Sequence, residues 1–528
     1  MGGFMDFAWP LLRQLTGKDR LGRGQAVKSA KTAALRARTS DADRVVKSVC
    51  PYCAVGCGQK VYVRDERVVQ IEGDPDSPIS RGRLCPKGSA TLQLTTGSGR
   101  RHKTLYRPPG AADWQEIDLD TAMDMVADRI IATRRETWEW EKDGKRTART
   151  MGVASLGGAT LDNEENYLIK KLLTALGVVQ IENQARVCHS SSVVGLGTSF
   201  GRGGATTFLQ DLQHSDCVVI QGSNFAEAHP VGFQWVMEAK ARGAVIIHVD
   251  PRFTRTSALA DLHVPIRAGS DVAFLGGIIN HVLENDLYFH EYVVNYTNAA
   301  TILREDYRDA EDQDGVFSGF DAADHTYDHG TWQYEGMSVV PAAGEREQDA
   351  GHRTGKLPPG RSEVQGATGL PMQGTAQRDE TLRHPRCVMQ VLRRHFARYT
   401  PEMVERVCGV PGPLFEQVCR HLTENSGPDK TAEFVYAVGW TQHSDGSQFV
   451  RAAGILQLLL GNVGRPGGGI QALRGHASIQ GSSDIPTLYN LLPGYIPMPH
   501  AHEHMKLRDF LRADAPSRGA GPTCPPTW

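Results

Sequence analysis

The chain has 528 residues and a formal net charge of −2 at pH 7, with 40% of its residues hydrophobic and 22% charged. This composition is typical of a globular protein of about three domains, and the balanced charge provides no field that favours nucleic acid or an anionic membrane. No apolar stretch approaches the length of a bilayer span; the most apolar one, residues 452–464, has the length of a buried helix.

The segment before Cys50 is basic, with ten Lys or Arg residues against four Asp or Glu. It has neither the apolar region of a secretion signal nor paired arginines, so we expect a cytoplasmic protein. A solvated tail and an arm that docks on an acidic partner both fit this segment.

Four cysteines follow at the spacing Cys50-x2-Cys53-x3-Cys57-x27-Cys85. Three thiolates within eight residues and a fourth from further along suit a [4Fe–4S] cluster, which needs one thiolate for each iron corner. A zinc site is the alternative, although zinc usually takes two short Cys pairs and the second half here supplies one Cys. A disulfide framework belongs to small secreted chains, whereas cysteines make up about two per cent of this long one. The spacing therefore favours an iron–sulfur redox protein.

Alternating strands and helices follow the cysteines. The expected elements are, in order, a β-hairpin at 59–73, a helix from about Leu119, a strand at 151–156, a helix from Asp162 to Gly177 and a strand at 178–182. The hairpin would bring Cys85 back towards the first three cysteines. Asp162 and Glu165 have the spacing of a capping box, and Gly177 is a C-terminal stop.

The second half of the chain shows a clearer alternation. Strands are expected at 216–223, 244–251 and 433–440, and helices at 229–243, 271–286, 387–399 and 446–461. Continuous apolar strands with amphipathic crossovers predict a parallel sheet covered on both faces. Residues from about 300 to 385 interrupt this rhythm, and eleven of the 38 residues in 341–378 are Gly or Pro, so we expect an irregular surface insertion there.

Two local features carry candidate chemistry. Lys87, two residues after Cys85, could tune a cluster or bridge to a second cofactor, or it is an ordinary surface lysine. Cys188 and His189 follow a predicted strand, where a thiol next to an imidazole suits a metal ligand or an activated nucleophile. A buried free cysteine is the competing interpretation.

Glycine-rich turns at 195–204, 222–230 and 464–469 let backbone N–H groups approach an anion. None has the nicotinamide or nucleoside-triphosphate fingerprint. Residues 249–257 place a carboxylate and two arginines after a strand, which suits a nucleotide or a helix-start ion pair. Arg474 lies in a glycine-flanked loop, where it could hold a small carboxylate or form a structural ion pair.

Together these motifs resemble the catalytic subunit of molybdenum or tungsten bis-molybdopterin-guanine-dinucleotide oxidoreductases. The resemblance runs from Val49 to about Pro499 and rests on CPYCAVGC, RLCPKG, GGATLDNEENYLIKKL, NQARVCHSS, GSNFAEAHPVGF, HVDPRFTRTS, RAGSD, YAVGWTQHS and LRGHASIQGSSD. The combination of Cys188-His189 with Arg474 resembles the one found in the long respiratory type of formate dehydrogenase. The implied fold is α/β: a small iron–sulfur domain with β-hairpins, then Rossmann-like parallel-sheet domains, with the family's C-terminal barrel domain missing.

The resemblance implies a role for each matching residue. The [4Fe–4S] cluster would be held by Cys50, Cys53, Cys57 and Cys85, with Lys87 between it and one pterin. Cys188 would ligate molybdenum or tungsten, at a position where many relatives carry selenocysteine. His189 would receive or relay a proton, and Arg474 would bind the formate carboxylate. The guanine dinucleotides would be held by Gly222, Asn224, Asp250, Arg252, Asp271, Gly439 and Gln442.

The implied activity is the two-electron oxidation of formate to CO2, with electrons leaving singly through the pterin and the cluster to an iron–sulfur partner subunit. The alternatives are another bis-pterin enzyme, such as a nitrate or polysulfide reductase, and an inactive electron-transfer fragment. His189 and Arg474 speak against the reductases, since nitrate reduction needs no carboxylate fork.

We expect a basic extension at 1–45, the cluster domain at 46–110, a first α/β segment at 111–181, the pterin-dinucleotide domain at 182–474 and the start of a further segment at 475–528. Relatives of this type continue well beyond residue 528, and the Pro/Gly tail at 513–528 does not resemble family sequence. A separate C-terminal half is therefore a candidate partner.

Overall fold

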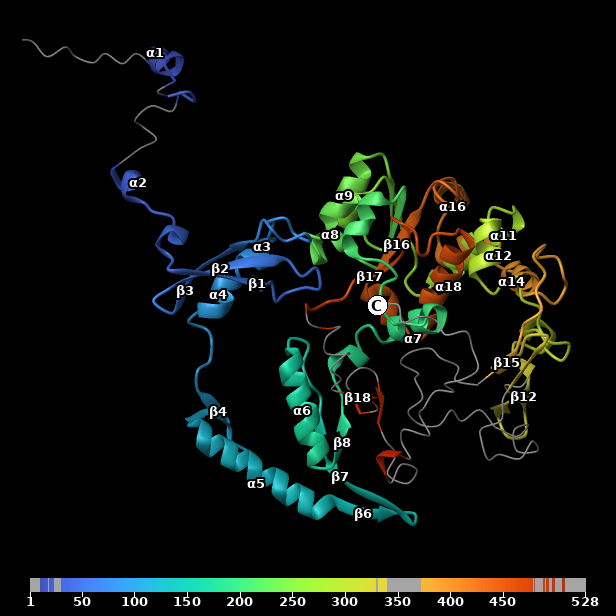
Figure 1. The fold of residues 1–528 in the computed structure, drawn as a ribbon, viewed down its shortest axis with the longest axis horizontal. Coiled ribbons are helices and arrows are strands. Elements are labelled where there is room, and N and C mark those ends of the chain that lie inside the picture. Colours follow the sequence, from blue (N-terminus) through green and yellow to red (C-terminus); the bar gives the residue numbers. More distant parts are fainter. Residues whose placement is uncertain are drawn as a thin grey trace, which may run out of the picture.

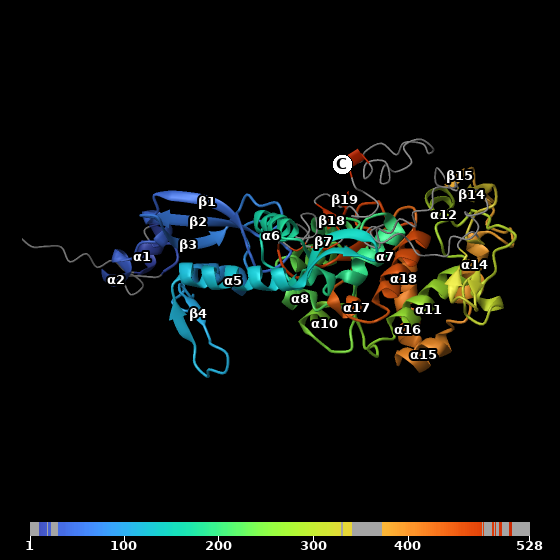
Figure 2. The ribbon, with the colours of Figure 1, turned by 90° about the horizontal axis from the view of Figure 1, so that it is seen from below.

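The computed structural model describes residues 10–17, 19–22, 30–328, 331–339 and 372–477, together with 479, 488–489, 491–492, 496–498 and 506–508. The molecule is elongated, with short N-terminal helices and a β-sheet towards one end and helices together with short strands towards the other (Figure 1, Figure 2). Within the part that is described, no helix combines the length and the apolar character that a membrane span requires.

The N-terminal domain is built on a three-stranded antiparallel sheet of order β1-β2-β3. Its elements are β1 (Arg44–Val49), β2 (Gly58–Arg64), β3 (Arg67–Gly73), α3 (Pro86–Ser89) and α4 (Thr91–Thr96). The predicted hairpin is confirmed: β2 and β3 pair through a turn at Asp65 and Glu66, both of which have positive φ. Cys85 is the residue before α3, so this helix starts at the fourth cysteine.

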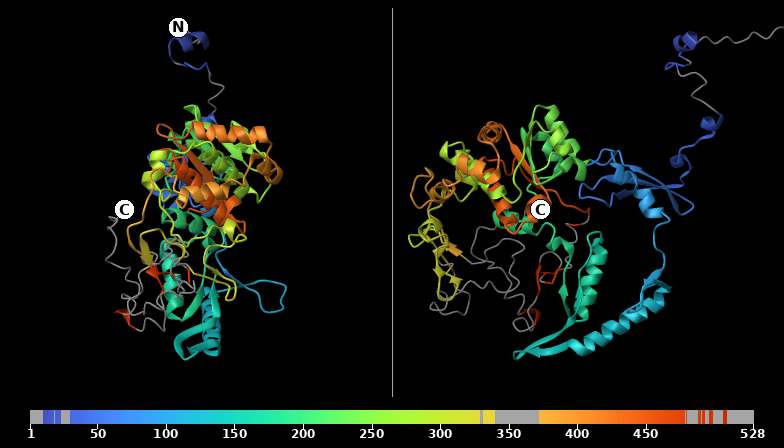
Figure 3. Two further views of the ribbon diagram at one scale, coloured as in Figure 1. Left: turned by 90° about the vertical axis from the view of Figure 1, so that its right-hand side faces the viewer. Right: turned by 180° about the vertical axis from the view of Figure 1, so that it is seen from behind.

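Residues 104–181 form a small layer that projects from the rest of the molecule (Figure 3). Its elements are β4 (Thr104–Tyr106), β5 (Gln115–Ile117), α5 (Leu119–Thr137), β6 (Trp138–Lys142), β7 (Lys145–Ser155), α6 (Asn163–Ala175) and β8 (Val178–Ile181). The capping box of Asp162 and Glu165 is confirmed, and Gly177 follows α6 with a φ of +77°. The strand predicted at 151–156 was too short, because it is the end of β7, which forms a hairpin with β6 through Asp143 and Gly144.

The main body contains a five-stranded sheet of order β11-β10-β9-β16-β17, and every neighbouring pair in it is parallel. The strands are β9 (Cys217–Gln221), β10 (Val245–Val249), β11 (Leu262–Val264), β16 (Ala432–Tyr436) and β17 (Gly469–Ala472). All residues of β9 and β16 are buried, as the continuous apolar strands predict. The residues of β17, where no strand was predicted, are buried as well. The parallel sheet is therefore confirmed.

Helices cover both faces of this sheet. On one face, α9 (Phe233–Ala241) packs against Val218 and Ile220 of β9. On the other, α11 (Asp271–Glu284) and α18 (Gly446–Leu459) pack against Cys217 and Val219. Because neighbouring strand residues point to opposite faces, one strand contributes to both cores.

Several element boundaries differ from the prediction. The helix expected at 229–243 begins only at Phe233, after a separate turn, α8 (Phe225–Ala228). The strand expected at 433–440 ends at Tyr436, because α17 (Val438–Thr441) follows immediately.

The region from about 300 to 385 is irregular where it is described, with short two-stranded sheets, and residues 340–371 lie outside the described residues. The tail at 513–528 also lies outside them. The remaining elements are α1 (Pro10–Leu15), α2 (Ala30–Ala34), α7 (Ser190–Phe200), α10 (Arg255–Leu259), α12 (His290–Tyr296), β12 (Phe320–Asp321), β13 (Thr326–Tyr327), β14 (Met337–Val339), β15 (Met372–Gly374), α14 (Val388–Phe396), α15 (Pro401–Cys408), α16 (Gly412–Glu424), β18 (Leu491–Leu492) and β19 (Ile496–Pro497).

Candidate active site

The candidate site lies at the carboxyl ends of the parallel strands. From β9 the chain runs outward to β10 and β11 on one side, whereas β16 and β17 extend the sheet on the other. The strand order thus reverses between β9 and β16, and ligands of open α/β sheets bind in the crevice at such a switch point.

Two glycines allow the loops after β9 and β16 to touch at this point. Gly222 has a φ of +66°, and its carbonyl accepts a hydrogen bond from the Gly439 amide at 3.1 Å. A Cβ on Gly439 would lie 2.5 Å from that carbonyl oxygen, and one on Gly222 would lie 2.9 Å from Cδ1 of Trp440. The close approach therefore depends on the absence of both side chains.

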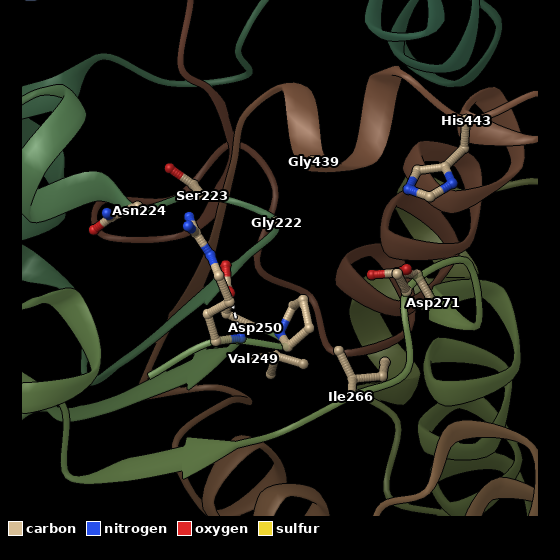
Figure 4. Close-up of a pocket in the computed structure, with 12 residues that line it drawn as sticks. Gly222, Ser223, Asn224, Val249, Asp250, Ile266, Asp271, Gly439 and His443 are labelled. Atoms are coloured by element: carbon tan, nitrogen blue, oxygen red, sulfur yellow. Dashed lines mark hydrogen bonds between the residues drawn. The ribbon is translucent and has the colours of Figure 1, made fainter. Parts of the chain in front are cut away.

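A pocket of about 340 Å³ opens beside these glycines (Figure 4). Six of the seven residues predicted to hold guanine dinucleotides line it: Gly222, Asn224, Asp250, Arg252, Asp271 and Gly439. The seventh, Gln442, is exposed and does not line the pocket, whereas the next residue, His443, does. Sequence reasoning missed His443 because the TQHS motif does not indicate which side chain faces inward.

Hydrogen bonds from neighbouring residues fix two carboxylates in the pocket. Oδ1 of Asp271 accepts hydrogen bonds from Nε2 of Gln221 at 2.8 Å and from Nε1 of Trp440 at 3.1 Å. Burial raises the pKa of Asp271, and these donors oppose that rise. Oδ1 of Asp250 accepts from the Arg252 amide at 2.8 Å. The pocket thus offers fixed acceptors together with an arginine, which suits a polar ligand such as a nucleotide.

Cys188 and His189 lie at the start of α7, next to the α17 turn. Thr441 donates from Oγ1 to the Cys188 carbonyl at 2.9 Å, and Ser191 donates from Oγ to the Thr441 carbonyl at 3.0 Å. Burial raises the pKa of the half-buried Cys188 thiol, while nearby Arg474 opposes this rise. These contacts connect the Cys188 loop to the switch point.

His189 is buried, and its Nδ1 lies 2.8 Å from Oγ of Ser192. The same Ser192 oxygen accepts a hydrogen bond from the Tyr436 hydroxyl at 2.7 Å. Burial, followed by the charge of Arg474, lowers the pKa of His189 to about 3, so its ring is neutral at ordinary pH. Ser192 and Tyr436 were not predicted, because their proximity to His189 depends on the packing of α7 against the sheet.

Arg474 follows β17 and is 6% exposed. Its Nη2 donates to the Gly203 carbonyl at 2.5 Å. Its charge opposes the rise in the pKa of Cys188 and adds to the lowering of the pKa of His189, so Arg474 lies within electrostatic range of both side chains. Segments nearly 290 residues apart thus meet at one edge of the sheet.

The four N-terminal cysteines converge on one side of their domain. All four belong to one apolar cluster, with Cys50 and Cys57 buried. Burial, and then repulsion by the other three thiolates, raises the pKa of Cys57 to about 12. Among the described residues, no group of three or more His, Cys, Asp or Glu side chains is arranged to hold a metal ion. Four converging thiols match the requirement of a [4Fe–4S] cluster for one thiolate at each iron corner.

Lys87 connects the cysteines with the main body. Its Nζ donates to the Ala228 carbonyl at 3.3 Å, and its charge lowers the pKa values of Cys50 and Cys53 against the larger effect of burial. On the same interface, the guanidinium of Arg81 lies 4.1 Å from the centre of the Trp235 ring. Lys87 therefore lies between the cysteines and the C-terminal end of α8.

Comparison with known proteins defines the family. The Molybdopterin oxidoreductase Fe4S4 domain matches residues 43–97, and the Molybdopterin oxidoreductase domain matches residues 103–508. The chain belongs to the molybdopterin oxidoreductase family, and it carries the family's two domains for a [4Fe–4S] cluster and a molybdopterin. The predicted family and fold class are therefore confirmed.

Within this family, the chain is similar to large subunits of formate dehydrogenases. It is 42% identical over 479 residues to formate dehydrogenase subunit alpha of Megalodesulfovibrio gigas, covering 90% of this chain and 44% of that protein. It is 41% identical over 482 residues to the formate dehydrogenase-O major subunit of Escherichia coli, with the same coverage. The chain thus spans less than half the length of these relatives. Acetylene hydratase from Pelobacter acetylenicus shares the fold, with a TM-score of 0.51, 16% identity and coverage of 79% of this chain and 43% of that one.

Proposed function

We propose that this chain forms the cluster and substrate-binding part of a formate dehydrogenase, in which formate is oxidised to CO2 and electrons leave through a [4Fe–4S] cluster to a partner subunit. The position of Cys188 and His189 beside the α17 turn, and of Arg474 just after β17, at the same carboxyl edge of the sheet, carries this proposal. The relatives named formate dehydrogenase support it independently.

Each residue has a part that its environment favours. Arg474 is buried and positively charged, so it can bind a carboxylate by a charge-assisted pair of hydrogen bonds and fix the direction of its C–H bond. Cys188 supplies a soft sulfur ligand for molybdenum or tungsten. The molybdenum or tungsten pterin group would accept the two electrons.

The oxidation of formate also releases one proton. The neutral His189 has one ring nitrogen without hydrogen, which can receive that proton. Because burial and Arg474 disfavour the charged ring, His189 would pass the proton on rather than retain it. Ser192, 2.8 Å from Nδ1, keeps the ring in a fixed orientation.

The polar pocket between Gly222 and Asp271 is proposed to hold a guanine dinucleotide of the pterin. Its position at the switch point and its fixed acceptors suit a nucleotide. Lys87, between the cysteines and Ala228, is proposed to lie on the electron path from the pterin to the cluster, and its contact with the main body supports this role.

The test is metal analysis of the anaerobically purified chain, followed by formate-dependent dye reduction. We expect iron and acid-labile sulfide in the ratio of a [4Fe–4S] cluster, together with one molybdenum or tungsten. Arg474→Lys should lower kcat/KM for formate about 100-fold, because lysine cannot form the bidentate pair, while the iron content stays unchanged.

Three outcomes would contradict the proposal. Zinc in place of iron would overturn the cluster. Iron without molybdenum or tungsten would indicate an electron-transfer fragment. Dye oxidation by nitrate or polysulfide, without formate-dependent reduction, would indicate a reductase.

A further inference from the structure

His229 occupies an unusual position between the cysteine domain and the Arg474 loop. It is the residue after α8 and is 5% exposed, with its ring edge-to-face against Phe225 at 6.1 Å. Its Nε2 lies 2.7 Å from the carbonyl oxygen of Arg474, 245 residues further along the chain. The histidine thus uses its side chain to hold the backbone of another segment.

The chemistry of this bond fixes the state of the ring. A carbonyl oxygen can only accept, so Nε2 carries the hydrogen. Burial lowers the pKa of His229, the hydrogen bond to the Arg474 carbonyl opposes this, and the charge of Lys87 adds a smaller lowering. Its Nδ1 has no hydrogen-bond partner among the described residues. The Nε2 donor is therefore the one polar interaction that the described structure gives this ring.

The loop that carries Arg474 is held at several points. The Leu473 amide donates to the Tyr436 carbonyl at 2.9 Å, and the Ala54 amide, in the cysteine loop, donates to the Gly475 carbonyl at 3.0 Å. These two bonds lie on either side of Arg474. The bond from His229 is accepted by the backbone carbonyl of Arg474 itself. Removing the His229 donor would take this hydrogen bond away from the backbone of the residue whose guanidinium must be aimed.

We propose that His229 is a positioning residue that sets the backbone of Arg474 and thereby aims its guanidinium at the carboxylate of the substrate. The proposal rests on the function proposed above, but its structural part, the fixing of the Arg474 loop, stands without it. A purely space-filling role is the competing explanation, since Phe225 and Phe233 provide an apolar surrounding.

The test compares two replacements of His229. In His229→Gln the side-chain amide nitrogen takes the place of Nε2 and keeps the donor, whereas His229→Leu keeps much of the volume and loses the donor. His281→Leu is the matched control, because half-buried His281 lies on α11, which covers the opposite face of the sheet.

Two measurements are made on the anaerobically purified chain. The first is hydrogen–deuterium exchange of the segment 472–477, which requires no activity. The second is KM and kcat for formate in dye reduction. We expect His229→Leu to speed exchange in this segment. It should also raise KM for formate about tenfold with a smaller change in kcat, because the loss of one hydrogen bond shifts the arginine that binds the substrate and leaves the reacting groups in place. His229→Gln and His281→Leu should stay close to the wild type in the exchange rate of this segment and in the kinetic constants for formate.

Unchanged exchange in His229→Leu, or equal effects of Gln and Leu, would overturn the proposal in favour of space filling. If the wild type does not oxidise formate, the proposed function fails, yet the exchange measurement still decides whether His229 fixes the loop. If His229→Leu does not fold, His229→Asn replaces it, since its shorter amide does not reach the Arg474 carbonyl.

Discussion

The five-stranded sheet and the layer at 104–181 are built from the same alternation of strands and helices, but they differ in burial. In the main body, β9 and β16 are buried along their whole length and α11 buries most of its residues. In the 104–181 layer, α5 buries only Ala122 of its 19 residues, and Leu168 and Leu172 of α6 are each 61% exposed. An amphipathic pattern thus defines which face of a helix is apolar. Whether that face is buried depends on whether another element packs against it.

The largest expected effect is in the buried sheet. Phe434→Ala in β16 removes a fully buried ring that packs near Trp440, with ring centres 6.4 Å apart. We expect a loss of about 3–5 kcal/mol in the free energy of unfolding, measured by chemical denaturation. A loss below about 1 kcal/mol would contradict the tight packing of this sheet.

Positive-φ glycines in the two regions provide the next test. Gly222→Val combines a φ of +66° with crowding against Trp440, so we expect a loss of roughly 2–5 kcal/mol. Gly144→Val, in the β6–β7 turn, has a φ of +72° but no heavy atom within 4 Å of its Cβ. Its smaller loss, about 1–3 kcal/mol, measures strain alone. Equal losses would contradict the close approach at the switch point.

A pH-dependent effect is expected at Glu433, which is buried in β16. Burial, and then the charge of Asp211, raises the pKa of Glu433 well above its ordinary value, so the folded chain keeps a proton that the unfolded chain has lost. The free energy of unfolding therefore decreases as pH rises through the ordinary Glu pKa. Glu433→Gln should be more stable than wild type at pH 8, by on the order of 1 kcal/mol, and equally stable near pH 4. Thermal melts across this range provide the measurement, and an advantage that does not depend on pH would exclude this explanation.

The smallest effect is expected on the exposed face of α6. Leu168→Ser should change the free energy of unfolding by less than about 0.5 kcal/mol, because the side chain is already 61% exposed. Chemical denaturation of Leu168→Ser and Phe434→Ala under the same conditions compares the losses in the free energy of unfolding in the two regions. A loss of several kcal/mol would show that this face is buried against another polypeptide or a second copy.

Local signals in the sequence predicted much of the fold. Asp162 and Glu165 form their capping box, and the continuous apolar runs at β9, β10 and β16 became parallel strands. Such features depend on neighbours within a few residues, so they are visible without the structure. By contrast, α15, α16, β11 and β17 were not predicted. The 13-residue α16 has an amphipathic pattern that sequence reasoning overlooked, whereas the short strands β11 and β17 are defined by their pairing with β10 and β16.

The same distinction applies to the candidate site. Motifs indicated Cys188, His189 and Arg474 because each carries its own chemistry. The supporting residues Ser192, Tyr436 and His229 are ordinary in sequence, and they become important only where three separate segments meet. Resemblance to a family can transfer reactive residues by motif, but their supports have to be found in three dimensions.

The hydrogen bond between Ala54 and Gly475 couples the cysteine domain to the Arg474 loop. Ala54 lies in the loop between the second and third cysteines, so the shape of this loop depends on how those thiols are held. Because this bond joins the cysteine loop to the residue after Arg474, a change in the cysteine loop is expected to reach the backbone of the Arg474 loop, although the two loops lie far apart along the chain.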